Sequence, residues 1–277
     1  MTTCFDIQAY REELRRRRDE ILTRFDAALA RSGRPRGSAQ LMAVSKTVGV
    51  DEVLAAIEVG YRLFGENRPQ ELNRKLEGLS AAGVPVNGLT ASSEAAPATP
   101  DALTGETDAE QASVRLDMIG NLQKNKINSV LGRAALIHSV SSLHLAHAIS
   151  ERAARRIAEG GLAAPQDVLL EVNVSGEASK SGFAPEELRA AIDELQGLDG
   201  IRIRGLMTMA PRGDNRIARQ TFAGLRELRD ELAAAHPALD LAELSCGMSE
   251  DFEAALEEGS TLVRLGRVVF NPAFELE

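Results

Sequence analysis

The side chains best suited to chemistry stand where short apolar runs of this 277-residue chain end. Lys46 follows the run 41–45, and Arg264 lies in the last run, two residues before Gly266. Partial burial at a strand end can lower the pKa of a lysine, which can then form a Schiff base with a carbonyl compound, although such a lysine is more often a solvated charge. A buried arginine needs an acceptor, either a structural carboxylate or a ligand.

An anion site is expected beside Arg264. Ser249 can cap the helical segment that follows it, and Gly266 lets backbone N–H groups approach a ligand closely. The loops after the last two strands of a (β/α)8 barrel commonly hold a phosphate. Glu250 and Asp251 would equally suit the first turn of a helix that binds nothing, so a plain N-cap stays open as the alternative.

Three other groups carry a weaker signal. His144, His147 and Glu151 share one face of an expected helix, but no further ligand cluster is visible, so we predict no metal site. Cys246 has no histidine nearby in the sequence, which favours a buried structural thiol over a nucleophile. The arginine run 15–18 has two glutamates beside it and is expected on a solvated helix face.

Eight apolar runs would position these side chains. The predicted strands are 41–45, 62–64, 114–119, 134–137, 168–174, 201–207, 239–244 and 261–265. The helical segments between them are 51–59, 67–79, 121–131, 142–158, 185–196, 214–235 and 249–258. This alternation implies a parallel sheet, and eight units in about 230 residues favour a (β/α)8 barrel over an open sheet. No G-x-G-x-x-G motif follows the first strand, which weighs against a Rossmann fold.

Two segments lie outside the alternation. Helical spacing of apolar residues predicts an N-terminal helix over the first 31 residues. The stretch 76–114 contains no lysine or arginine, and within it we expect residues 81–112 to form a disordered insertion, because they cannot bury enough apolar surface. The chain is otherwise expected to be a single α/β barrel domain spanning residues 1–277.

Composition excludes several classes of protein. The formal net charge of −9 argues against nucleic acid as a partner. The longest apolar run is too short to span a membrane, and the N-terminus lacks the apolar core of a secretory signal. Two cysteines, Cys4 and Cys246, do not make a disulfide framework, so a cytoplasmic location is expected.

A lysine, an arginine and a phosphate cradle at one barrel mouth suggest pyridoxal 5′-phosphate (PLP) as cofactor. The chain resembles the pyridoxal phosphate homeostasis protein family, whose members are single-domain relatives of the alanine racemase N-terminal barrel. The matching motifs run in order over most of the chain. They are AVSKT (43–47), FGEN (64–67), IGNLQKNK (119–126), EVNVSGEASKSGF (171–183), RGLMT (204–208), LSCGMSEDF (244–252) and EEGSTLVRLG (257–266).

The resemblance implies a role for each site residue. Lys46 would carry PLP as an internal aldimine, and Arg264 would face the pyridine nitrogen. The other implied contacts are Ser245, Ser249, Gly266 and Arg267 around the phosphate, with Met248 and Asn67 near the ring.

The chain departs from the family pattern at a few positions. Leu116 and Asp117 replace the usual Trp-His, Cys246 replaces a methionine, and Arg267 replaces a threonine. Arg267 can still donate its backbone N–H, and its side chain could add a charged contact to the phosphate. None of these changes touches Lys46 or Arg264, so cofactor binding should survive.

The implied function is non-catalytic. The protein would hold PLP reversibly on Lys46, limit the free aldehyde and deliver it to apo forms of PLP-dependent enzymes, as a monomer or weak dimer. An arginine opposite the ring nitrogen favours its unprotonated form and weakens the cofactor as an electron sink. Alanine racemase adds a tyrosine base from a second domain, whereas this chain has only Tyr10 and Tyr61 and is expected to lack that domain. An amino-acid racemase or isomerase stays open as the alternative, as does a barrel for another phosphorylated ligand.

Overall fold

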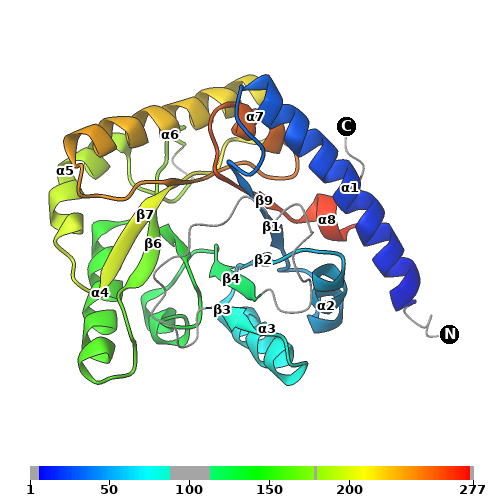
Figure 1. Ribbon diagram of the computed structural model, residues 1–277. Helices are drawn as coiled ribbons and strands as arrows, with labels where there is room; N and C mark the ends of the chain where they lie inside the picture. The colour runs from blue at the N-terminus through cyan, green and yellow to red at the C-terminus, as the bar shows by residue number, and fades with distance from the viewer. Residues whose placement is uncertain (1–5, 88–112, 178–179, 275–277) are drawn as a thin grey trace.

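Eight parallel strands close into a barrel in the computed structural model of the protein, which describes residues 6–87, 113–177 and 180–274 (Figure 1). They are β1 (Gln40–Val44), β2 (Leu63–Glu66), β4 (Val114–Met118), β5 (Ile137–Val140), β6 (Gln166–Glu171), β7 (Ile201–Met207), β8 (Glu243–Ser245) and β9 (Leu262–Leu265). Pairing of β9 with β1 and of β2 with β4 completes the ring. The predicted (β/α)8 barrel is therefore confirmed.

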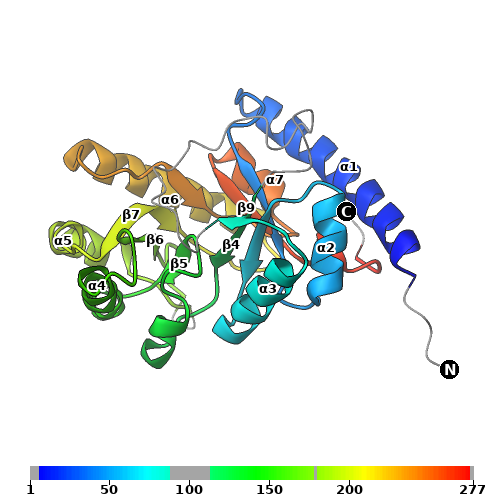
Figure 2. The ribbon, with the colours of Figure 1, turned by 60° about the horizontal axis from the view of Figure 1, so that its bottom comes forward.

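Helices cover the outside of the barrel (Figures 1 and 2). They are α1 (Ile7–Arg31), α2 (Val50–Glu58), α3 (Pro69–Ala81), α4 (Leu143–Ala158), α5 (Pro185–Gln196), α6 (Asn215–Ala235), α7 (Phe252–Glu257) and α8 (Arg267–Phe270), with the 3-10 helix η2 (Lys124–Ser129). Asp6, Ser142 and Asp214 accept backbone N–H bonds at the starts of α1, α4 and α6, as good N-cap residues do. None of the described helices is long and apolar enough to cross a membrane.

The predicted N-terminal helix is α1, which lies along α7 and α8 on one side of the molecule (Figures 1 and 2). Of the arginine run, Arg15 and Arg16 are exposed as expected, but the prediction was wrong for Arg17, which is buried. Arg17 donates to the carbonyl oxygens of Val268, Pro272 and Phe274. These acceptors offset the cost of burying the guanidinium and anchor the segment after α8.

Three expected elements differ in place or type. The predicted strand 239–244 is shifted, because β8 starts only at Glu243. The predicted strand 134–137 is shifted: β5 starts at Ile137 and ends at Val140, because the apolar residues before it fill a turn. The predicted helix 121–131 is only the short η2. The shift matters for function, because it places His138 inside the barrel, where the sequence pattern had not indicated a strand.

The predicted insertion starts later than residue 81. Residues 81–87 form the end of α3, a turn and a two-residue strand, β3 (Val86–Asn87), which pairs with the start of β4. Val84 and Val86 pack against the core, and this burial orders the segment. The rest of the predicted insertion, residues 88–112, lies outside the described residues, as does Cys4.

A buried ion pair joins the barrel to α3 beside Ser45, the first residue after β1. Lys75 of α3 and Glu66 of β2 are both fully buried, and their side chains contact each other. Lys75 Nζ also donates to the Ser45 carbonyl oxygen at 2.5 Å, and Ser45 Oγ donates to Glu66 Oε1 at 2.6 Å. The pair therefore holds the carbonyl oxygen and the hydroxyl of Ser45, the residue before Lys46.

This ion pair predicts a measurable asymmetry in stability. Lys75→Met leaves the Glu66 carboxylate buried without a countercharge and should lower the free energy of unfolding by about 3–5 kcal/mol. The double variant Glu66→Gln/Lys75→Met keeps an acceptor for Ser45 and removes both charges, so it should lose less. Urea unfolding measures both; a double variant as unstable as Lys75→Met would contradict the role of the ion pair.

Candidate functional site

The expected lysine lies at the carboxyl end of the barrel. Lys46 is the second residue after β1 and is exposed, not partly buried as expected from its place at a strand end. The register of β1 and β9 pairs Met42 with Arg264. Lys46 starts four residues beyond Met42, roughly 13 Å further along if the backbone stays extended. Lys46 and Arg264 thus belong to neighbouring strands, with Lys46 further toward the carboxyl end of the barrel.

Arg264 is buried without a carboxylate beside it. Its guanidinium donates to Ser245 Oγ at 2.6 Å and to the Thr208 carbonyl oxygen at 3.0 Å. Burial lowers its pKa. Among the residues that the structure describes, no carboxylate oxygen lies within 4 Å of it. Of the two acceptors expected for this arginine, a structural carboxylate is therefore absent from the described part of the chain.

The two carboxyl groups that act on Arg264 through their charge, Asp251 and Glu171, are both weakened by burial, which raises the pKa of each. Glu171, the last residue of β6, is buried, and burial raises its pKa, although Arg264 opposes the shift. A carboxyl group with a raised pKa carries less of its charge near neutral pH. The positive charge of Arg264 is thus poorly balanced from within the protein, which suits an anionic or electron-rich ligand.

A polar network that the sequence did not indicate continues from Arg264 into the barrel. His138 Nδ1 lies 3.0 Å from Ser245 Oγ, and His138 Nε2 lies 3.0 Å from Asp117 Oδ2. Arg115 donates two bonds of 2.9 Å to the Asp117 carboxylate. His138, Ser245 and Asp117 are all fully buried. Ser245, expected near a phosphate, instead has its hydroxyl committed to Arg264 and His138.

The expected phosphate cradle consists of Ser249, Gly266 and Arg267, which follow β8 and β9. Ser249 is buried, and its Oγ accepts a long bond of 3.4 Å from the backbone N–H of Val268 in α8. A side chain at Gly266 would meet only Val44, at ordinary contact distance, so the protein's own packing does not demand glycine there. Close approach of a ligand, the role expected for Gly266, is compatible with this open space.

The Arg267 side chain points elsewhere than expected. It pairs with Glu250 at 2.5 Å and stacks over the Phe274 ring, 5.1 Å from its centroid. These contacts join the two loops of the cradle across its outer side. The plain N-cap alternative for Ser249 is not what the structure has, because α7 begins only at Phe252, after Asp251.

Two glycines lie beside Asn67 and Met248, the remaining residues expected at the site. Gly120 follows β4 and lies against Asn67, so that a Cβ at residue 120 would come within 2.2 Å of the Asn67 carbonyl oxygen. Gly247 has φ +94°, and a Cβ there would collide with α7. The half-buried Met248 follows it, with its N–H donating to Asp251 Oδ1 at 2.6 Å. Asn67, after β2, and Met248, after β8, thus belong to the same barrel mouth, with β1 and β9 between their strands.

The weaker candidates are structural. Cys246 is buried, and burial raises its thiol pKa to about 11, as expected for a thiol without a reactive role. His147 pairs with Glu194 on the next helix at 2.7 Å. No group of three or more His, Cys, Asp or Glu side chains within the described ranges could hold a metal ion.

Comparison with known proteins agrees with this geometry. A family model described as "Alanine racemase, N-terminal domain" matches residues 19–272. The pyridoxal phosphate homeostasis protein of Aquifex aeolicus (strain VF5) is 35% identical over 255 residues, which are 92% of this chain and 96% of that protein.

Two solved structures are also similar. An unknown protein from Bifidobacterium adolescentis is 37% identical, with a TM-score of 0.79 over 95% of this chain and 96% of that one. PipY of Synechococcus elongatus PCC7942 with PLP bound is 31% identical, with a TM-score of 0.67 over 89% of this chain and 100% of that one. The chain therefore belongs to the alanine racemase N-terminal domain family and, within it, to the pyridoxal phosphate homeostasis proteins.

Proposed function

We propose that this protein binds PLP at the carboxyl end of its barrel and holds it as a Schiff base on Lys46, without turnover. One observation carries the proposal: an exposed lysine and a buried arginine without a carboxylate partner lie on neighbouring strands at the same mouth. PLP supplies an aldehyde that condenses reversibly with a primary amine. Its ring nitrogen accepts a hydrogen bond, and its phosphate carries negative charge, so the donor set fits the cofactor. PipY, a solved relative, binds PLP.

Each residue of the site makes a different contact with PLP. Lys46 provides the amine, and Arg264 donates toward the ring nitrogen. Ser249, with the backbone N–H groups at Gly266 and Arg267, surrounds the phosphate. Met248 and Asn67 flank the ring from the two sides of the mouth. Ser245 belongs with Arg264, since its hydroxyl already accepts from the guanidinium.

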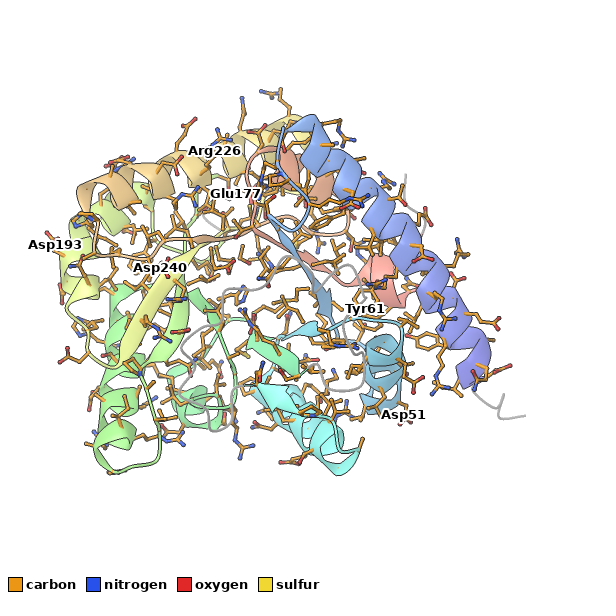
Figure 3. The ribbon with its side chains drawn as sticks, viewed as in Figure 1. Asp51, Tyr61, Glu177, Asp193, Arg226 and Asp240 are labelled. Atoms are coloured by element: carbon orange, nitrogen blue, oxygen red, sulfur yellow. The ribbon has the colours of Figure 1, made fainter. Side chains whose placement is uncertain are left out.

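The residues favour a carrier over a racemase. Arg264 only donates, so it disfavours a protonated ring nitrogen and the electron withdrawal that carbanion chemistry needs. Tyr61 precedes β2 and so lies at the amino end of the barrel, beside α1 and α2 (Figure 3). Burial raises the pKa of Tyr61 and raises that of Tyr10, on α1, to about 12. Neither described tyrosine is placed to act as a base at the mouth.

We infer that apo forms of PLP-dependent enzymes receive the cofactor, and that the protein acts in the cytoplasm as a monomer or weak dimer. The buried free thiol of Cys246 suits a reducing compartment. Homologues are named for PLP homeostasis, a role that calls for reversible rather than permanent attachment. Direct transfer is tested by mixing PLP-loaded protein with an apo-enzyme and a PLP-trapping amine; activation faster than release into the trap supports transfer.

Binding through Lys46 predicts a visible Schiff-base absorption band when the protein is mixed with PLP. Lys46→Ala and Lys46→Arg should both abolish the band, because neither offers a primary amine, although the arginine keeps the positive charge. Lys124→Ala removes a primary amine from η2 that contacts none of the residues named above, so it should retain the band and controls for unspecific reaction. A full band in Lys46→Arg would contradict attachment at this residue. A wild-type protein that binds other phosphorylated ligands but not PLP would favour a different cargo.

A carrier should not exchange protons at the α-carbon of amino acids. We expect no deuterium incorporation at Cα when PLP-loaded protein is incubated in D2O with a panel of amino acids, since neither described tyrosine is placed to act as a base and Arg264 disfavours an electron-poor ring. The measurement is mass spectrometry of the recovered amino acids. Exchange with any member of the panel, lost in Lys46→Arg, would establish the racemase or isomerase alternative.

A further inference from the structure

Side chains from four strands form an unbroken hydrogen-bonded chain inside the barrel. Arg264 of β9 contacts Ser245 of β8, and the same Ser245 oxygen contacts His138 Nδ1 of β5. His138 Nε2 contacts Asp117 of β4, which Arg115 holds with two bonds. The PLP contacts proposed above use only the Arg264 end. Asp117, His138 and Arg115 therefore have no role in them.

The donors and acceptors of this chain allow one consistent placement of hydrogens. An arginine only donates, so Ser245 Oγ accepts from Arg264, and its own hydrogen is free to point to His138 Nδ1. An unprotonated Nδ1 leaves the ring hydrogen on Nε2, where the Asp117 carboxylate accepts it. The bonds from Arg264 to Ser245, from Ser245 to His138 and from His138 to Asp117 then all run in the same direction, and Arg115 donates to Asp117 from the other end.

The surrounding charges favour this neutral ring. Burial lowers the pKa of His138; Asp117 on β4 opposes the shift, while Arg264 on β9 and Arg115 on β4 reinforce it. Burial by itself would raise the pKa of Asp117, but Arg115 and His138 outweigh it and keep that pKa below its usual value. A carboxylate and a neutral imidazole are thus the expected partners, matching the hydrogen placement above.

The order Asp117, His138, Ser245 resembles a catalytic triad, but the geometry does not fit a nucleophile. Ser245 is 0% exposed, so no substrate carbonyl can reach its oxygen. Its oxygen also accepts from Arg264 at 2.6 Å, which fixes the hydroxyl within the network. The row of hydrogen bonds therefore acts on Arg264 and not on a substrate.

We propose that Asp117 and His138 are positioning residues. Asp117 locks His138 in its Nε2–H tautomer, and His138 then accepts the Ser245 hydrogen, so that Ser245 presents its lone pairs to Arg264. With Thr208 accepting on the other side, the guanidinium is held at two points, and its remaining N–H groups keep one direction. The proposal rests on the PLP site proposed above. It adds that Asp117 and His138, which do not contact the cofactor, set the direction in which Arg264 donates to the ring nitrogen.

The tautomer can be measured on the protein alone. The chain has four histidines, and His138 is the buried one, while His144 and His147 are exposed and His236 is half-buried. Long-range 15N–1H NMR of 15N-labelled protein should reveal one histidine that stays neutral with hydrogen on Nε2 between about pH 5.5 and 8. A buried histidine with hydrogen on Nδ1, or one that protonates in this range, would overturn the proposal.

A variant pair tests the link to the cofactor. Asp117→Asn keeps the shape but lets the amide donate to His138, so the tautomer is no longer fixed. We expect PLP to dissociate about two- to tenfold faster and the pH titration of the bound-PLP band to shift. Asp26→Asn is the matched control: this α1 aspartate pairs with Arg36 at 3.0 Å and contacts none of the residues of the network. It should change neither quantity.

The outcomes separate the two proposals. Equal dissociation rates and band titrations in both variants and the wild type would contradict the positioning role, whatever the change in stability. If Asp117→Asn does not fold, the NMR measurement on the wild-type protein still decides. A wild-type protein that takes up no PLP would contradict the proposed function, and the tautomer measurement would remain a valid test of the hydrogen-bonded chain.

Discussion

The site depends on one buried cation, the guanidinium of Arg264, which has no carboxylate beside it in the described chain. Burying an unpaired charge is costly, and two uncharged acceptors, Ser245 and Thr208, offset only part of that cost. Burial also raises the pKa of Glu171, which limits the negative charge available nearby. The residual positive potential favours a ligand that brings an acceptor and an anion into the mouth, which is how PLP would satisfy it.

The rest of the fold holds this site from outside the barrel. The ion pair of Glu66 and Lys75 fixes Ser45 behind Lys46, and the close approach of Gly120 fixes Asn67. Arg17, reaching from α1, anchors the carbonyl groups after α8 and so the far side of the phosphate cradle. These contacts leave the Lys46 side chain exposed at the mouth.

Sequence patterns predicted the barrel and most of its strands and helices, and they placed Lys46 just after the first strand, because strand–helix alternation and strand-end positions follow simple periodicities. They did not predict His138. The segment Ile137–Val140 has two adjacent polar residues, His138 and Ser139, at its centre, whereas the preceding residues 134–137 form the more apolar run, so the strand was placed too early. Arg17 was missed for a similar reason: its carbonyl acceptors come from the opposite end of the chain. Tertiary partners of this kind leave no local signal.

The most direct test of the account is the position of the covalent adduct. PLP-loaded protein is reduced with borohydride, digested, and its peptides are weighed by mass spectrometry. The account predicts one pyridoxyl group per chain, on the peptide that contains Lys46, with the other lysine peptides unmodified. An adduct spread over several lysines, or a single adduct on a peptide without Lys46, would contradict it.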